Sequence, residues 1–228
     1  TRPALLRAQW WWLVWTVLRS DAGSVECTSC VKETSESKVE DSARSLIEIS
    51  TSSLSGLSEE TAARTVTLNS VSKTFAMTGW RLGYCLGPLS LAPVLSRINH
   101  LTTRCATSYV QYAAITAYTK GMPHLETMRA VYAERREAIA AGLERIAGMR
   151  CPLPEGTFYA FADFPEDWGD SRSLAQHLLA EGGIVVTPGS AYGEASRFNL
   201  RFSFATSMDL IEEGLNRLTQ LLPPANRI

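Results

Sequence analysis

The segment from Ser70 to Tyr84, SVSKTFAMTGWRLGY, constrains the chain most, because it holds a lysine, small hydroxyls and an arginine at fixed spacing. Ser70 and Ser72 lie within three residues of Lys73, and Arg81 follows it eight positions later. A lysine amine becomes a covalent catalyst when it is held near a carbonyl and partly desolvated. Hydroxyls and a planar guanidinium donate to the oxygens of a phosphate dianion. The spacing therefore predicts a site for a phosphorylated aldehyde cofactor around Lys73.

Two glycines, Gly79 and Gly83, flank this arginine. We expect them to let the backbone turn sharply and approach a ligand closely. For so short a motif, the alternative is a polar turn from Leu68 to Thr74, followed by an apolar segment in which Arg81 is merely solvated. The length of the pattern, rather than the lysine alone, favours the cofactor site.

Five ordered segments between about Thr65 and Leu222 resemble the second half of a class I aminotransferase, a pyridoxal-phosphate enzyme of the aspartate aminotransferase superfamily. The lysine segment matches the family's SxSK and TGWRxGY motifs without a gap. Four further segments resemble the family's Q-x-A-A helix and its P-x-G-[AT]-F-Y-x-F, V-x-P-G-x-x-F/Y-G and L-R-[IF]-S-[FY]-A motifs: Gln111–Ala114, Pro154–Phe161, Val186–Gly193 and Leu200–Ala205.

The resemblance implies a role for each matching residue. Lys73 is the residue that forms a Schiff base with pyridoxal 5′-phosphate and then moves a proton on the substrate. Ser70 and Arg81 bind the cofactor phosphate. Arg201, in the last segment, binds the α-carboxylate of the amino acid substrate.

Arg201 also fits that role on physical grounds. Leu200, Phe202 and Phe204 surround it in an alternating segment, so we expect a poorly solvated guanidinium for which a bidentate carboxylate is a favourable partner. The alternative is an arginine at a strand edge that faces water. Its position in the matching segment favours the ligand role.

The implied fold class is α/β: a partial fold type I pyridoxal-phosphate-dependent transferase. We expect the remnant of a large mixed-sheet cofactor domain at residues 61–140 and a small C-terminal α/β domain at residues 141–228. Residues 1–60 are expected to form an atypical or non-family leader that is partly disordered. The 228 residues and the 45% hydrophobic content are ordinary for a globular chain with a real core.

Two family motifs that precede the lysine have no counterpart in this chain. These are an NPxNPxG turn and a D-x-x-Y segment, whose aspartate pairs with the cofactor ring nitrogen. The first asparagine of the chain is Asn69 and its first tyrosine is Tyr84. Glu40 and Asp41 lie at a comparable distance before Lys73, but no tyrosine follows three positions later. We therefore expect the family's N-terminal half to be missing or replaced.

The apolar run from Gln9 to Leu18 follows Arg2 and Arg7, as in a signal peptide. It is too short to span a bilayer as a helix, and four tryptophans are unusual in a signal core. A buried strand or a non-native leader is favoured. Ser20–Ser55 is polar and without aromatic residues, which predicts loop, weak helix or disorder.

The cysteines and the charge balance exclude other classes. Cys27 and Cys30 form a CxxC pair, but a structural zinc site needs four ligands, so no metal is predicted. Five cysteines without a disulfide pattern favour a reducing cytoplasm. A formal net charge of −1 is unlike that of a nucleic-acid-binding protein, and neither nucleic acid nor membrane is an expected partner.

Periodicity predicts the remaining elements. We expect strands at 66–68, 81–86, 157–162, 184–187 and 199–204, and helices at 89–99, 108–119, 125–146, 173–181 and 207–222. On the long helix, Leu125, Met128, Val131, Tyr132, Ile139, Leu143 and Ile146 are expected on one face and Glu134–Glu137 in solvent. Ser207 is the predicted N-cap of the last helix.

The resemblance implies transfer of an amino group between an L-amino acid, aspartate-like or aromatic, and a 2-oxo acid. It also implies a homodimer. Two alternatives stay open: a lyase or synthase of the same cofactor fold, and a truncated, non-catalytic remnant. An assay that distinguishes a keto-acid product from an eliminated leaving group separates transamination from a lyase or synthase. Schiff-base absorbance with pyridoxal phosphate tests the non-catalytic remnant.

Overall fold

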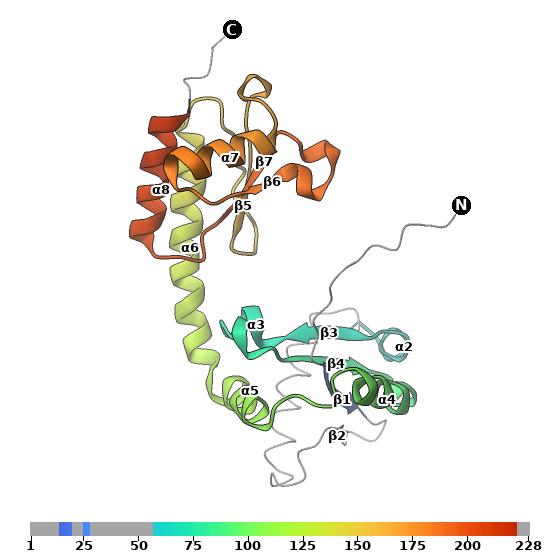
Figure 1. The fold of residues 1–228 in the computed structure, drawn as a ribbon. Helices are drawn as coiled ribbons and strands as arrows, with labels where there is room; N and C mark the ends of the chain where they lie inside the picture. Colours follow the sequence, from blue (N-terminus) through green and yellow to red (C-terminus); the bar gives the residue numbers. More distant parts are fainter. Residues whose placement is uncertain (1–13, 20–24, 28–56, 223–228) are drawn as a thin grey trace, which may run out of the picture. The chain divides into compact units, whose positions relative to one another are not determined.

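The computed structural model describes residues 14–19, 25–27 and 57–222 (Figure 1). The chain divides into two compact units, Thr1–Leu125 and Glu126–Ile228, called unit 1 and unit 2 below. The predicted domains, 61–140 and 141–228, stay predictions. Within the described ranges, no helix has both the length and the apolar character needed to cross a bilayer.

Unit 1 contains a four-stranded mixed sheet in the order β2-β1-β4-β3, formed by β1 (Val14–Arg19), β2 (Val25–Cys27), β3 (Thr67–Ser70) and β4 (Gly83–Gly87). β1 runs parallel to β4, whereas β2 and β3 run antiparallel to their neighbours. β1 confirms a strand in the apolar run for residues 14–18; residues 9–13 lie outside the described part.

β2 corrects one prediction. Val25–Cys27 was expected to be loop, weak helix or disorder, yet it forms a strand paired with β1. A strand edge presents unpaired backbone groups, and these favour pairing even with a short polar segment. The rest of the polar stretch lies outside the described residues.

The helices of unit 1 follow the predicted order with shifted bounds. They are α2 (Glu59–Ala63), α3 (Val71–Thr74), α4 (Ala92–Thr102) and α5 (Ser108–Lys120), with 3-10 turns η2 (Thr78–Trp80) and η3 (Leu89–Leu91). The helix predicted at 89–99 thus starts as η3, and a proline near the start of α4 fits the first helical turn. The short helices α2 and α3 were not predicted.

A buried cluster joins the lysine segment to α5. Its members are Val71, Met77, Leu82, Tyr84, Ala106, Val110, Ala114 and Tyr118. The last three recur every four residues and therefore share one face of α5. Gln111 is also buried, and its Nε2 donates to the Ala106 carbonyl oxygen at 2.6 Å. The Q-x-A-A segment thus packs beneath the segment that carries the lysine.

One apolar stripe of unit 1 stays exposed. Leu91, Val94, Ile98 and Leu101 are spaced three and four residues apart along η3 and α4, and all four are exposed. Leu101 retains 79% of its accessible surface. Helix α4 therefore presents an apolar face to solvent.

Unit 2 contains an antiparallel sheet in the order β5-β7-β6, formed by β5 (Tyr159–Asp163), β7 (Asn199–Ser203) and β6 (Thr187–Pro188). β5 starts two residues later than predicted, because Thr157 has the left-handed φ of 68°. β6 is shorter than the predicted 184–187, since only Thr187 and Pro188 pair with β7.

Three helices belong to this half of the chain: α6 (Met122–Glu144), α7 (Ser171–Gly182) and α8 (Met208–Leu221). Three 3-10 turns accompany them, η4 (Glu166–Trp168), η5 (Gly189–Tyr192) and η6 (Glu194–Ser196). Ser207 is the N-cap of α8, as predicted, and its Oγ accepts from the Leu210 N–H.

The long helix α6 follows its predicted pattern only towards its end. Ile139 and Leu143 are buried, as is Ile146 just beyond the helix, but Val131 is exposed. Arg136, expected in solvent, is half-buried, and its Nη1 donates to the Pro154 carbonyl oxygen at 3.5 Å. The apolar stem of an arginine packs on a surface while its head finds a polar partner.

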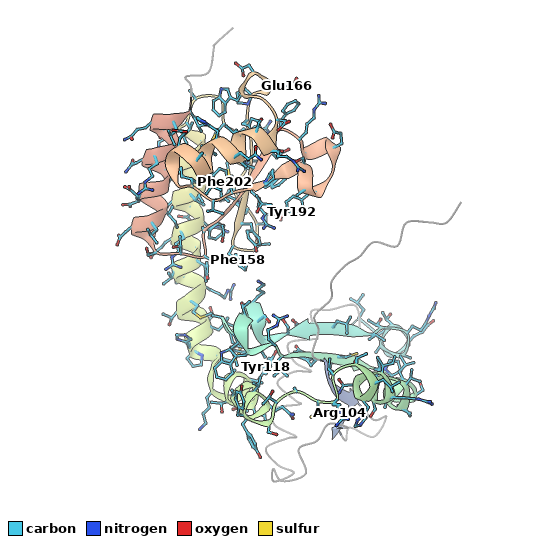
Figure 2. The ribbon with its side chains drawn as sticks, viewed as in Figure 1. Arg104, Tyr118, Phe158, Glu166, Tyr192 and Phe202 are labelled. Carbon is cyan, nitrogen blue, oxygen red and sulfur yellow. The ribbon has the colours of Figure 1, made fainter. Side chains whose placement is uncertain are left out.

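The core of unit 2 lies between the sheet and its helices. Buried residues from α6, α7, α8, β5 and β7 make one continuous cluster, in which Leu143, Leu178, Leu200 and Phe204 are fully buried. Tyr132 on α6 meets the ring of Phe204 edge to face, with centroids 6.3 Å apart. Figure 2 shows Phe158 and Phe202 among these packed side chains.

Candidate functional site

The lysine lies just after the end of a strand, on a helix of a single turn. Ser70 ends β3 and is the N-cap of α3, where its Oγ accepts from the Ser72 N–H at 3.3 Å. Val71 is buried and anchors the helix, whereas Lys73 in the same turn is exposed. The backbone is thus fixed by the core and the amine is left accessible. The desolvation expected for a reactive lysine does not come from the described residues of unit 1.

Left-handed residues, rather than glycines, shape the loop that follows. Ala76 has φ 53° and Arg81 has φ 54°, on either side of η2. The predicted sharp turn at Gly79 and Gly83 is therefore wrong in position, since neither glycine has a positive φ. A Cβ on Gly79 would meet no atom within 4 Å, which leaves room for the predicted close approach of a ligand. A non-glycine residue in this region stores strain, and such strain clusters at functional sites.

Pairing of β3 with β4 brings the predicted phosphate ligands to one junction. Ser70 pairs with Gly83, and the Val71 N–H donates to the Leu82 carbonyl oxygen at 3.3 Å. Arg81 directly precedes that pair, and its Nη1 donates to the Thr78 carbonyl oxygen at 3.1 Å. Ser70 and Arg81 therefore reach the same end of the sheet. Their role as phosphate ligands stays a prediction.

Buried tyrosines lie behind this junction. The rings of Tyr84 on β4 and Tyr118 on α5 (Figure 2) meet edge to face, with centroids 5.9 Å apart, and Asn69 pairs with Tyr84 across the sheet. Burial raises the pKa of both tyrosines, so both stay neutral. The Asn69 Oδ1 also accepts from the Ser70 N–H at 2.8 Å. Asn69, which pairs with Tyr84 across β3 and β4, thus bonds to the residue that caps α3.

Arg201 lies in unit 2, at the centre of β7. It pairs with Phe161 on one side and Thr187 on the other, and its Nη2 donates to the Thr187 Oγ1 at 3.2 Å. Its Cζ lies 4.1 Å from the ring centroid of Tyr159 and 5.2 Å from that of Tyr192 (Figure 2). The guanidinium is therefore half-buried among aromatic rings.

The predicted cause of this partial desolvation is wrong. Leu200, Phe202 and Phe204 are buried on the core side of the sheet, whereas the side chain of Arg201 lies on the opposite face. Tyr159 and Tyr192 shield the guanidinium instead. Both belong to segments that the sequence singled out. The register between β5 and β7 was needed to place Tyr159 beside the arginine, and the pairing of β6 with β7, just before η5, to place Tyr192.

Local hydrogen bonds fix the two tyrosines. The Tyr159 N–H donates to the Thr157 Oγ1 at 3.1 Å, within the left-handed turn that precedes β5. The Ser190 N–H donates to the buried Ser171 Oγ at 3.1 Å, which ties η5, and with it Tyr192, to the start of α7. Thr157 and Ser171 were not predicted as site residues. The signal that could have found Ser171 is its complete burial, and sequence periodicity does not reveal the burial of a polar residue.

The cysteines form no cluster in the described part of the chain. Cys85, Cys105 and Cys151 are not joined in disulfides there, and burial raises the pKa of Cys151 to about 11. Cys27 contributes its backbone to β2, and Cys30 lies outside the described residues. Among the described residues, no three His, Cys, Asp or Glu side chains gather as a metal site requires.

Comparison with known proteins identifies the family. Residues 38–218 match the family of class I and II aminotransferases. The aspartate aminotransferase of Bacillus subtilis (strain 168) is 36% identical over 175 residues, which are 75% of this chain and 44% of that protein. The aromatic-amino-acid aminotransferase 2 of Thermococcus litoralis is 34% identical, with 76% and 44% covered. The chain thus spans less than half the length of these relatives.

Solved structures agree with this match. An aromatic aminotransferase from Pyrococcus horikoshii OT3 superposes with a TM-score of 0.67 and 33% identity, covering 71% of this chain and 44% of that one. The Thermus thermophilus aspartate aminotransferase with maleate gives 0.65 and 31%, covering 71% and 42%. The mixed α/β architecture is that of a partial fold type I transferase, as predicted. The chain therefore belongs to the class I and II aminotransferase family.

Proposed function

We propose that this chain is the lysine-bearing and carboxylate-binding portion of a pyridoxal-phosphate-dependent aminotransferase. It would act between an L-amino acid, aspartate-like or aromatic, and a 2-oxo acid. Relatives named for aspartate, aromatic and aspartate/prephenate substrates support this range. The observation that carries the proposal is the pairing of Ser70 with Gly83 and of Val71 with Leu82, which places the backbone of Ser70, Lys73 and Arg81 at the same end of β3 and β4.

The donor set at this junction fits pyridoxal 5′-phosphate chemically. Lys73 offers an amine for the aldehyde, while Ser70 offers a hydroxyl and Arg81 a guanidinium for the phosphate. When bound, the cofactor supplies an electron sink for the bond that breaks at the substrate α-carbon. Both phosphate ligands lie on backbone that the β3–β4 pairing fixes, so little ordering is needed when the dianion binds.

Lys73 is the proposed general base as well as the covalent anchor. Its Nζ would take the proton from the substrate α-carbon and hold it for return. An exposed lysine on a flexible four-carbon side chain suits this role, because the amine has to leave one position and act at another. Desolvation, which favours the neutral amine, would come with the bound cofactor and substrate.

Arg201 is the proposed carboxylate ligand. A guanidinium carries five N–H donors in one plane, and Thr187 accepts from only one nitrogen, Nη2. Shielding by Tyr159 and Tyr192 removes competing water and strengthens a charge-assisted hydrogen bond. The relative solved with maleate, a dicarboxylate, supports a carboxylate as the ligand class.

The wider assignments complete the proposal. Residues 61–140 would belong to the large cofactor domain and 141–228 to the small domain. The family match begins at residue 38, so a leader outside the family pattern would be confined to the residues before it. The active form would be a cytoplasmic homodimer. The absence of disulfides at Cys85, Cys105 and Cys151 is compatible with a reducing compartment.

Spectroscopy tests the proposal directly. Mixing the purified chain with pyridoxal 5′-phosphate should produce a visible absorbance band that Lys73→Ala abolishes. Lys73→Arg is the matched control, because it keeps the charge and removes the nucleophile; it should lose the band too. Retention of the band in both variants would show that another amine reacts. No band in the unaltered chain would reject cofactor binding and favour the remnant hypothesis.

Activity separates transamination from the other chemistry of this cofactor. With aspartate or an aromatic amino acid and 2-oxoglutarate, the chain should form the matching keto acid together with glutamate. Release of a leaving group without glutamate would instead favour a lyase. Arg201→Leu should raise KM for the amino acid far more than it weakens the absorbance band, since the proposed role of Arg201 concerns the substrate alone.

A further inference from the structure

Three contacts with the two preceding residues hold Tyr159 in place: one to its ring and two to its backbone. Its ring lies 4.4 Å from that of Phe158, centroid to centroid, and Thr157 holds its backbone N–H. The Thr157 hydroxyl also donates to the Tyr159 carbonyl oxygen at 3.4 Å. Both hydrogen bonds form within a turn where Thr157 has φ 68°. A β-branched residue in this region is a genuine outlier, so the turn is held against strain.

The ring that this turn fixes lies directly against the guanidinium of Arg201. The 4.1 Å separation between the Arg201 Cζ and the Tyr159 centroid is well inside the range of a cation–π contact. Tyr192 adds a second, longer contact at 5.2 Å, and its own ring meets Phe161 edge to face. Tyr192 is more exposed than Tyr159, so its contact is the more solvated of the two.

These contacts limit how the guanidinium can turn. A ring stacked on a guanidinium leaves only its edge for hydrogen bonds, and Thr187 takes a bond from one nitrogen. A bidentate partner then has to approach in the plane of the guanidinium. We propose that Tyr159, held by the Thr157 turn, is a positioning residue that orients Arg201 for a planar carboxylate. We call this arrangement of Tyr159 against Arg201 the clamp. The identity of its ligand rests on the proposed function, but the clamp itself does not.

The clamp can be observed without any catalytic activity. In the full chain, the Nε–H proton of Arg201, assigned by its loss in Arg201→Lys, should be shifted upfield by the Tyr159 ring. Rotation about its Cζ–Nε bond should also be slow. Tyr159→Phe should keep both signatures, because it keeps the ring. Tyr159→Leu should lose them, and Tyr192→Leu should change them less.

Carboxylate binding gives the second readout, with 2-oxoglutarate as the probe and calorimetry on the cofactor-free chain. Tyr159→Leu should weaken binding about fivefold and Tyr159→Phe less than about twofold. Far-UV circular dichroism checks that each variant is folded. Should Tyr159→Leu not fold, Thr157→Gly serves instead, because it frees the Tyr159 backbone and leaves the ring; it should reduce both signatures in part.

The outcomes distinguish the clamp from the proposed function. A shifted, slowly rotating Arg201 signal that Tyr159→Leu abolishes, in a chain that binds no 2-oxoglutarate, would support the clamp and overturn the substrate assignment. An Arg201 signal that is unshifted, or equally shifted in Tyr159→Leu, would overturn the positioning role whatever the chain binds. Equal loss of affinity in Tyr159→Phe and Tyr159→Leu would also overturn it, because the hydroxyl would then be the important group.

Discussion

The lysine junction of unit 1 and the arginine site of unit 2 obtain their geometry in different ways. Arg201 lies on a sheet whose other face closes a buried core, and aromatic rings of its own unit shield it. Lys73 is exposed, and left-handed residues on the loop after it set the path to Arg81. Unit 1 also leaves the apolar stripe of η3 and α4 exposed. Residues of unit 2 thus orient the guanidinium of Arg201. Residues of unit 1 anchor the backbone of Lys73 but leave its side chain exposed.

The largest expected difference between the units concerns core packing. Phe204→Ala removes a fully buried ring and should lower the free energy of unfolding of unit 2 by about 3–5 kcal/mol. Leu101→Ala, on the exposed stripe of unit 1, should change it by less than about 0.5 kcal/mol. Urea denaturation followed by tryptophan fluorescence and circular dichroism measures both. A comparable loss for Leu101→Ala would mean that the stripe is covered in solution.

Two glycines in the predicted site segments should respond differently to alanine. A Cβ on Gly189, in unit 2, would collide with the carbonyl oxygens of Ser196 and Asn199, which are backbone atoms. Gly189→Ala should therefore cost about 1–3 kcal/mol of stability. Gly79→Ala, in unit 1, enters open space and should be neutral within about 0.5 kcal/mol.

Cofactor binding then sharpens the test at Gly79. If a ligand approaches this backbone closely, Gly79→Ala should weaken the absorbance band formed with pyridoxal 5′-phosphate while leaving the urea midpoint unchanged. An unchanged band would remove close approach as the reason for the glycine.

The buried tyrosines of unit 1 predict a smaller, pH-dependent effect. Tyr118→Phe removes the hydroxyl of a buried tyrosine and should cost about 1 kcal/mol near neutral pH. Burial raises the folded-state pKa of Tyr118, so its contribution is complete below the unfolded pKa of about 10 and falls as the pH rises above it. The stability gap between the unaltered chain and Tyr118→Phe should therefore narrow in alkali. A gap that widens there would contradict the sign of this shift.

The smallest expected effect lies at the surface of unit 2. The Asp170 Oδ1 accepts from the backbone N–H groups of Arg172 and Ser173, at 2.9 and 2.8 Å, and these bonds lower the pKa of Asp170. A depressed folded pKa contributes stability above the unfolded value of about 3.9, and this is lost as the pH falls through the folded pKa. Asp170→Ala should lower the Tm slightly at pH 7. The difference should shrink in acid, and a constant difference from pH 7 to 2 would argue against capping by the carboxylate.

Local patterns predicted those parts of the fold that depend on neighbouring residues. The apolar spacing of α5 and the hydroxyl at Ser207 indicated elements that the structure confirms. The meeting of Ser70 with Arg81 also follows from local sequence, because β3 and β4 are joined by a short segment. The β5–β7 register joins residues far apart in the chain, so the contact between Tyr159 and Arg201 could not be read from either segment alone.

Two errors have a common physical origin. The sharp turn was assigned to Gly79 and Gly83 because glycine tolerates positive φ at least cost, yet the positive φ values fall at Ala76 and Arg81. Leu200 and Phe202 were taken as neighbours of the Arg201 guanidinium because they are adjacent in sequence, although alternation sends them to the other face. In both cases adjacency in sequence was a poor guide to where the backbone turns or which face a side chain takes.

Ala76 offers an opportunity for protein engineering. Its methyl group lies on a backbone with φ 53°, which costs about 1–2 kcal/mol relative to the right-handed region. Glycine would remove that cost. The greater conformational entropy of the unfolded glycine variant would offset about 0.5–1 kcal/mol of the gain in stability. Ala76→Gly thus offers a thermostabilised scaffold that retains every side chain proposed to hold the cofactor. Heat tolerance could then be tuned at one position while the chemistry at its neighbours is varied freely.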